Sequence, residues 1–199
     1  MAELYSAAYY GDCNAIKRHL KRKADTQWKH PHGGATATYV AAEFNHPDAL
    51  KILLDAGAPV DEPRADGATP LYRACQTAGR LDVAKILIQA KANVNQTDPT
   101  GVTPLWMAIH HDLADLVELL LDNGADPAKE VRGWKPIELA RKEDRTKCTA
   151  LLEKRLPAEA KASTQQQQHG AKDVTPEQNK LYVCAKTGNV AALRVLLAE

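Results

Sequence analysis

The stretch Asp66-Gly67-Ala68-Thr69-Pro70-Leu71 opens the unit, residues 66–95, around which the chain is organised. Thr69 can cap a helix with its hydroxyl group, and Pro70 suits a first helical turn because its missing N–H would have no partner there. A short helical pattern follows, then a glycine break, then a second helical pattern over residues 81–90. Two such short helices cannot bury their apolar faces alone, so the unit is expected to stack on copies of itself.

Copies of this unit recur along the chain at a period near 33 residues. Thr69-Pro70-Leu71 returns as Thr103-Pro104-Leu105, and Thr36-Ala37-Thr38 and Lys135-Pro136-Ile137 hold the equivalent places before and after them. A repeat of this length with this pattern resembles the ankyrin repeat family. The resemblance implies an all-α fold, an ankyrin-repeat solenoid of stacked helix-turn-helix units joined by β-turn or hairpin loops.

The repeat pattern divides the chain into an array, a linker and a further partial unit. The array is expected to cover residues 1–156, with repeats at about 1–27, 28–65, 66–98, 99–130 and 131–156. Residues 157–176 are rich in Gln and Ala and are expected to form a flexible linker. Residues 177–199 resemble the first helix pair of the array. Either this pair packs back on the array, or it begins a second array in a longer protein.

Composition argues against several classes of partner and location. The 199 residues carry a net charge of +1, so no global field selects nucleic acid. No run of 18 apolar residues is present, so no membrane insertion is expected. The four cysteines fall in different repeats without a Cys-x-x-Cys pair and are interpreted as reduced core residues. We therefore expect a cytoplasmic protein, with the nucleus as an alternative. The basic run at residues 17–23 has the composition of a nuclear-localisation signal, but a solvated helix end is the favoured interpretation.

Catalytic and metal-binding patterns are not found in the sequence. It contains no nucleophile elbow, Walker loop, His-Glu-x-x-His or Gly-x-Gly-x-x-Gly motif. His110 and His111 are adjacent, and adjacent residues on a helix point about 100° apart, which disfavours their binding one metal ion. We expect no enzymatic activity, no metal and no cofactor.

The ankyrin resemblance implies that a protein partner is bound by the loop tips and by the exposed ends of the first helices, which line a concave groove. Aromatic residues and Arg dominate binding hot spots, so their presence at such places favours binding. The predicted contact residues on helices are Tyr9, Tyr10, Glu43, Phe44, Gln76, Thr77, His110 and His111. Those in loops are Trp28, His30, Arg64, Asp66, Asp98, Arg132 and Trp134.

An alternative for the aromatic residues is that they pack between repeats. Both interpretations stay open for Tyr10 and Phe44, whereas packing is favoured for Trp28 and exposure for Trp134. The family usually places a histidine after Thr-Pro-Leu, but this chain has Tyr39, Tyr72, Trp106 and Glu138 at these places. These departures put the family's Thr–His hydrogen-bond network in question. Finally, Val94-Asn95 matches the closing turns that can be hydroxylated in the family, so the resemblance implies that Asn95 is a candidate hydroxylation site.

The favoured function is a non-catalytic scaffold or adaptor, a monomeric array that binds another protein. One alternative is a regulatory or targeting module of a larger multidomain enzyme that extends beyond residue 199. A second alternative is binding to an anionic surface through residues 17–23, which would depend strongly on salt.

Overall fold

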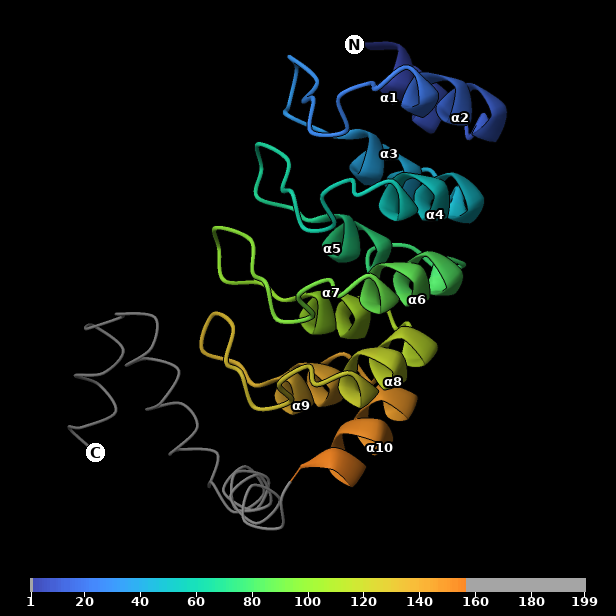
Figure 1. Ribbon diagram of the computed structural model, residues 1–199. Helices are drawn as coiled ribbons and strands as arrows, with labels where there is room; N and C mark the ends of the chain where they lie inside the picture. Colours follow the sequence, from blue (N-terminus) through green and yellow to red (C-terminus); the bar gives the residue numbers. More distant parts are fainter. Residues whose placement is uncertain (1, 157–199) are drawn as a thin grey trace, which may run out of the picture. The chain divides into compact units, whose positions relative to one another are not determined.

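The computed structural model describes residues 2–156, and the predicted linker and second helix pair lie outside them (Figure 1). The described part is helical. The elements in chain order are α1 (Ala2–Tyr9), α2 (Cys13–Lys21), α3 (Ala37–Glu43), α4 (Pro47–Asp55), α5 (Pro70–Ala74), α6 (Leu81–Gln89), α7 (Pro104–His110), α8 (Ala114–Asp122), α9 (Pro136–Lys142) and α10 (Thr146–Arg155).

The helices form two rows. The inner row stacks α1, α3, α5, α7 and α9, and the outer row stacks α2, α4, α6, α8 and α10 (Figure 1). Loops that link successive pairs project from the inner row on one side. Within residues 2–156 the extended pairing is limited to a single bridge, Val131 with Trp134. The all-α solenoid of helix pairs predicted from the repeat pattern is therefore confirmed.

Threonine caps start the inner helices as the sequence predicts. The hydroxyl oxygens of Thr36, Thr69 and Thr103 accept hydrogen bonds from backbone N–H groups three residues later, at 3.1–3.2 Å. These caps satisfy N–H groups that the helix itself leaves unpaired. At the fourth such place, before α9, Lys135 offers no hydroxyl. There Glu138 accepts a hydrogen bond from the Lys135 N–H at 2.9 Å and partly replaces the cap.

The chain reverses between inner and outer helices through left-handed residues, as the Gly, Asn and Asp there predict. Their φ angles are positive, at Gly11, Asn45, Gly79, Asp112 and Asp144. Two lysines after outer helices, Lys23 and Lys91, also have positive φ, 57° and 68°. Each of these lysines costs roughly 1 kcal/mol relative to glycine, because a Cβ crowds the backbone in this conformation.

The core lies between the two rows and is built from equivalent positions of each repeat. Leu71, Leu105 and Ile137 from the inner row are at most 2% exposed. Thr38 takes this place in the second repeat, and its buried hydroxyl has no hydrogen-bond partner among the described residues. The inner helix of the third repeat, α5, has five residues, whereas α3, α7 and α9 have seven. A membrane-spanning helix would need a longer apolar run than any helix within residues 2–156 provides.

Candidate binding surface on the inner face

Aromatic side chains are exposed together where two inner helices end. We call Tyr9, Tyr10 and Phe44 the exposed aromatic cluster; their exposed fractions are 37%, 74% and 43%. The Tyr9 ring centroid lies 4.3 Å from that of Phe44 and 5.0 Å from that of Tyr10. The rings thus contact one another across α1 and α3 but remain open to solvent, on the surface formed by the inner row and its loops. We call this surface the inner face.

A second aromatic group lies at the first loop and is more enclosed. The Trp28 ring packs edge-on against Tyr5, with centroids 5.8 Å apart, and His30 stacks on Tyr5 at 4.8 Å. Trp28 and His30 are half-buried. Burial raises the pKa of Tyr5, and the negative charge of Glu43 adds to this effect. The loop is therefore fixed on α1 by ring packing, which leaves part of Trp28 and His30 for contact.

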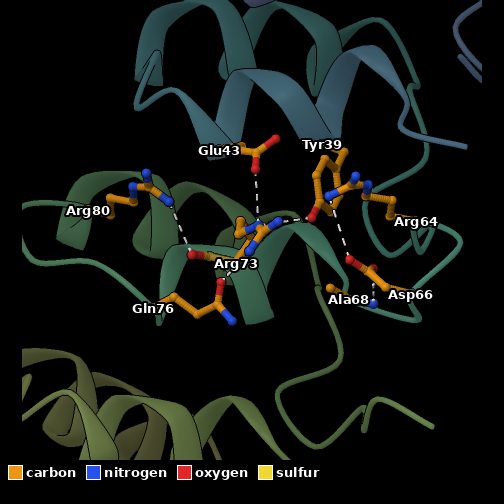
Figure 2. Close-up of polar contacts among 8 residues, drawn as sticks. All are labelled: Tyr39, Glu43, Arg64, Asp66, Ala68, Arg73, Gln76 and Arg80. Atoms are coloured by element: carbon orange, nitrogen blue, oxygen red, sulfur yellow. Dashed lines mark hydrogen bonds and ion pairs between the residues drawn. The ribbon is translucent and has the colours of Figure 1, made fainter. Parts of the chain in front are cut away.

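Next to the aromatic cluster, polar side chains converge from α3, from α5, from the loop between α4 and α5 and from the turn between α5 and α6 (Figure 2). We call this group the polar cluster; it comprises Tyr39, Glu43, Arg64, Asp66, Arg73, Gln76 and Arg80. Arg73 is its centre. Its Nε donates a hydrogen bond to the Tyr39 hydroxyl at 3.0 Å and lies 3.1 Å from a Glu43 carboxylate oxygen. A terminal nitrogen of the same guanidinium donates a hydrogen bond to the Gln76 amide oxygen. The Arg73–Glu43 pair joins the second repeat to the third.

Two further arginines border Arg73 in the polar cluster. Arg64 lies 3.6 Å from Asp66 and beside Tyr39 (Figure 2), whose oxygen raises the pKa of Arg64. Arg80 donates a hydrogen bond to the Arg73 carbonyl at 3.2 Å. Among the described residues, Arg80 has no carboxylate within ion-pair distance. Burial lowers the pKa of Arg80, and Arg73 adds to the lowering while Glu43 opposes it.

The arrangement at Arg80 differs from that at the equivalent places of other repeats. His46 and Arg145 also precede outer helices, and both reach back to the preceding repeat, to the carbonyls of Tyr9 at 3.0 Å and His110 at 3.0 Å. Arg80 instead bonds a carbonyl of its own repeat. The third repeat also differs from its neighbours in having one extra residue in this turn and a shorter inner helix.

The other predicted helix residues are distributed along the inner row. Thr77 is exposed at the end of α5, and Gln76 is engaged by Arg73. His110 pairs with Glu143 of the next repeat at 2.9 Å. Burial lowers the pKa of His111, and its neighbour His110 adds to this. His110 and His111 thus lie at the junction of the fourth and fifth repeats, whereas the aromatic cluster lies at the junction of the first and second.

The predicted loop residues of the later repeats form a second, separate area. Asp98 accepts hydrogen bonds from Thr100 and from the Val102 N–H. Burial alone would raise the pKa of Asp98, but these hydrogen bonds outweigh burial and lower it. Arg132 donates to the Thr100 hydroxyl at 3.1 Å. Trp134 is 41% exposed, with the Lys142 ammonium 4.4 Å from its ring centroid. No group of metal-binding side chains occurs within residues 2–156.

Comparison with known protein families decides the class of the chain. A family model described as ankyrin repeats, with three copies, matches residues 4–98 and 78–165. The chain belongs to the ankyrin repeat family. Ankyrin repeats are generally protein–protein interaction modules and are typically non-catalytic. No curated protein matches the chain.

In this ankyrin array, tyrosines occupy two of the positions where the family usually has a histidine, and they form hydrogen bonds to the next repeat. At the histidine place, Tyr39 accepts from Arg73 of the next repeat, and Tyr72 donates to Asp98, also of the next repeat, at 3.4 Å. Of the polar cluster, Glu43, Arg64, Asp66 and Gln76 are among the contact residues predicted from the sequence, whereas Tyr39, Arg73 and Arg80 are not. A signal was available: Tyr39 and Arg73 are separated by about one repeat length, the spacing at which side chains of neighbouring inner helices meet.

Asn95 links two closing turns of the ankyrin array. Its side-chain oxygen accepts from the Asp126 N–H at 2.9 Å, and its side-chain nitrogen donates to the Gly124 carbonyl at 2.9 Å. Hydroxylation of this residue stays a prediction. One repeat earlier, Asp61 accepts the equivalent bond from the Asn93 N–H at 2.9 Å, but its other carboxylate oxygen is buried without a partner in the described residues. Burial raises the pKa of Asp61, and the bond from Asn93 opposes this.

The substitution Asp61→Asn is expected to stabilise the array by about 1 kcal/mol at neutral pH, because an amide can donate the bond that the carboxylate cannot make. By analogy with Asn95, the acceptor would be the Lys91 carbonyl. The pKa of Asp61 is higher in the folded state than in the unfolded state. The free energy of unfolding of the wild type therefore falls as the pH rises through the folded-state pKa. The gain should therefore be full at neutral pH and vanish in acid, where Asp61 is protonated in both states. Urea unfolding at several pH values measures it.

The matched control for this change is Asp55→Asn, at an exposed position on the outer row. It removes the same charge without a buried acceptor nearby and should change the free energy of unfolding by less than about 0.5 kcal/mol. An equal gain in both variants would assign the effect to net charge rather than to the missing donor. A gain for Asp61→Asn that persists in acid would contradict both explanations, because a protonated Asp61 is neutral and can donate the bond itself.

Proposed function

We propose that this chain is a non-catalytic scaffold or adaptor that binds a protein partner through its inner face. The observation that carries the proposal is the exposed aromatic cluster of Tyr9, Tyr10 and Phe44, three large rings in mutual contact that stay open to solvent. Elsewhere in the described residues, Trp134 is the other large hydrophobic side chain exposed to this degree. A contiguous exposed apolar area rimmed by polar groups is typical of a protein-binding site.

The neighbourhood of the cluster fits this role. The polar cluster includes Glu43, the residue before Phe44, and it contains three arginines. Aromatic residues and Arg are the residue types enriched in hot spots. The inner row is rigidly joined there, by Arg73 to Glu43 and by His46 to the Tyr9 carbonyl. A rigid surface loses little conformational entropy on binding, which favours affinity.

The double substitution Tyr10→Ala with Phe44→Ala tests the proposal. It should weaken binding to the natural partner about 30-fold, which corresponds to about 2 kcal/mol, while the far-ultraviolet circular dichroism of the chain stays unchanged. The partner is first captured from the native host by the full-length chain and identified, and its purified form is then titrated against wild type and variant.

A matched control is Leu54→Ala with Ile86→Ala, which removes apolar groups that line a shallow pocket of about 490 Å³ on the outer row. This control should bind the partner as wild type does. If the control weakens binding as much as the test variant, or if the test variant unfolds the chain, the aromatic cluster is structural and the proposal fails.

A further inference from the structure

The polar cluster carries unbalanced charge at a half-buried position. It contains three guanidinium groups, Arg64, Arg73 and Arg80, against two carboxylates, Glu43 and Asp66. Arg73 pairs with Glu43 at 3.1 Å, and Arg64 faces Asp66 at 3.6 Å. Arg80 is left without a carboxylate among residues 2–156, although it is half-buried. A guanidinium withdrawn from water without a counter-ion is unfavourable, so this place favours an incoming anion.

The Arg80 side chain is held in position for such an anion. One of its terminal nitrogens donates to the Arg73 carbonyl at 3.2 Å, which holds one end of the guanidinium (Figure 2). The remaining N–H groups have no hydrogen-bond acceptor in the described part of the chain. A planar guanidinium with free N–H groups matches a carboxylate, which can accept two parallel hydrogen bonds.

The exposed aromatic cluster lies next to this place. Phe44 directly follows Glu43, whose carboxylate contacts Arg73, and the Arg73 carbonyl holds Arg80. The Phe44 ring is 43% exposed and contacts Tyr9. A partner segment that lies along the ends of α1, α3 and α5 therefore meets apolar rings first and a free guanidinium next.

We propose, building on the proposed function, that the inner face recognises a partner segment in which an Asp or Glu lies close to a large apolar side chain. Arg80 binds the carboxylate, and Tyr9, Tyr10 and Phe44 bind the apolar side chain. Glu43 and Asp66 already neutralise Arg73 and Arg64, so one carboxylate completes the charge balance of the polar cluster. A doubly charged phosphate would meet these two carboxylates at the same place, which favours an acidic side chain over a phosphorylated one.

The test is a selection with the full-length chain as the immobilised target and a random peptide display library as the probe. Wild type should enrich peptides that combine Asp or Glu with a nearby aromatic or large aliphatic residue. Arg80→Gln should keep the apolar preference and lose the acidic one. The matched control Arg18→Gln removes the same charge from an exposed site on α2 and should enrich the same peptides as wild type.

Affinities of one enriched peptide then quantify the effect by fluorescence anisotropy. Wild type should bind the Glu form about tenfold more tightly than its Gln form, and Arg80→Gln should bind both equally. Arg80→Lys keeps the charge but not the planar fork, so it should retain only part of the preference for Glu; it also serves if Arg80→Gln fails to fold.

Several results would overturn the inference. They are an absence of acidic residues among wild-type peptides, an acidic preference that persists in Arg80→Gln, and tighter binding of a phosphoserine form than of the Glu form. The proposed function is tested separately, by the binding of the natural partner to the aromatic-cluster variant. If the natural partner still needs Tyr10 and Phe44 but Arg80 carries no preference, only the inference fails; if the partner ignores the aromatic cluster, the proposed function fails first.

Discussion

Replacing Gly67 with alanine is expected to lower the free energy of unfolding by about 3 kcal/mol, because two penalties combine. Gly67 has a φ angle of +81°, a conformation that costs about 1 kcal/mol for a residue with a side chain. A Cβ at this position would also overlap Cδ of Pro99 and lie 2.7 Å from its Cγ. Pro99 belongs to the next loop and is a rigid ring, so the two loops would have to separate. Urea unfolding followed by circular dichroism measures the loss.

The chain contains its own control one repeat later. Gly101 has a φ angle of +82°, but no atom lies within 4 Å of the Cβ that an alanine would add. Gly101→Ala should therefore show the backbone penalty alone, about 1 kcal/mol. Introducing Gly67→Ala into a Pro99→Ala background should reduce its cost to the same value. Equal losses for the two glycines in the wild-type background would refute the proposed contact between loops.

This pair of glycines shows what sequence can and cannot predict in a repeat protein. The helix starts follow from local chemistry: the cap at Thr69 depends on residues within one turn, and its hydrogen bond is found as expected. The same holds for the left-handed turn at Asp112. The contact between Gly67 and Pro99 joins two loops and depends on how one repeat is placed on the next, which no local pattern specifies.

In the candidate site, too, some features follow from the local sequence and others depend on the packing of one repeat on the next. Exposure of Tyr10 and Phe44 at the ends of inner helices agrees with the repeat alignment, because equivalent positions in other repeats do not pack the core. The contact that Arg80 makes could not be predicted, because the carbonyl that it bonds depends on the packing of a turn with one extra residue. The alignment did place Thr38 at the position of a core leucine, but only the packed structure shows that its hydroxyl lacks a partner.

Replacing Arg73 with methionine is the second large effect, with an expected loss of about 2–3 kcal/mol in the free energy of unfolding. Methionine keeps much of the apolar stem but removes the bonds to Tyr39 and Gln76 and the ion pair with Glu43. The Glu43 carboxylate would be left without a cation within 4 Å. The pair is about a quarter exposed, at 24% and 26%, so solvent screens part of the cost and the expected loss lies below that of a fully buried pair.

The Arg73 prediction has two checks beyond the urea midpoint. Burial is the main cause that raises the pKa of Tyr39, and the positive charge of Arg73 partly offsets it, so the pKa of Tyr39 should rise further in Arg73→Met. Ultraviolet titration of the tyrosines reports this change.

Adding Glu43→Gln should recover part of the lost stability, because no unpaired charge then remains. Lys85→Met, which removes an exposed ion pair with Asp82, should cost less than about 0.5 kcal/mol. A similar loss from both substitutions would mean that Arg73 acts as an ordinary surface charge and does not join the second repeat to the third.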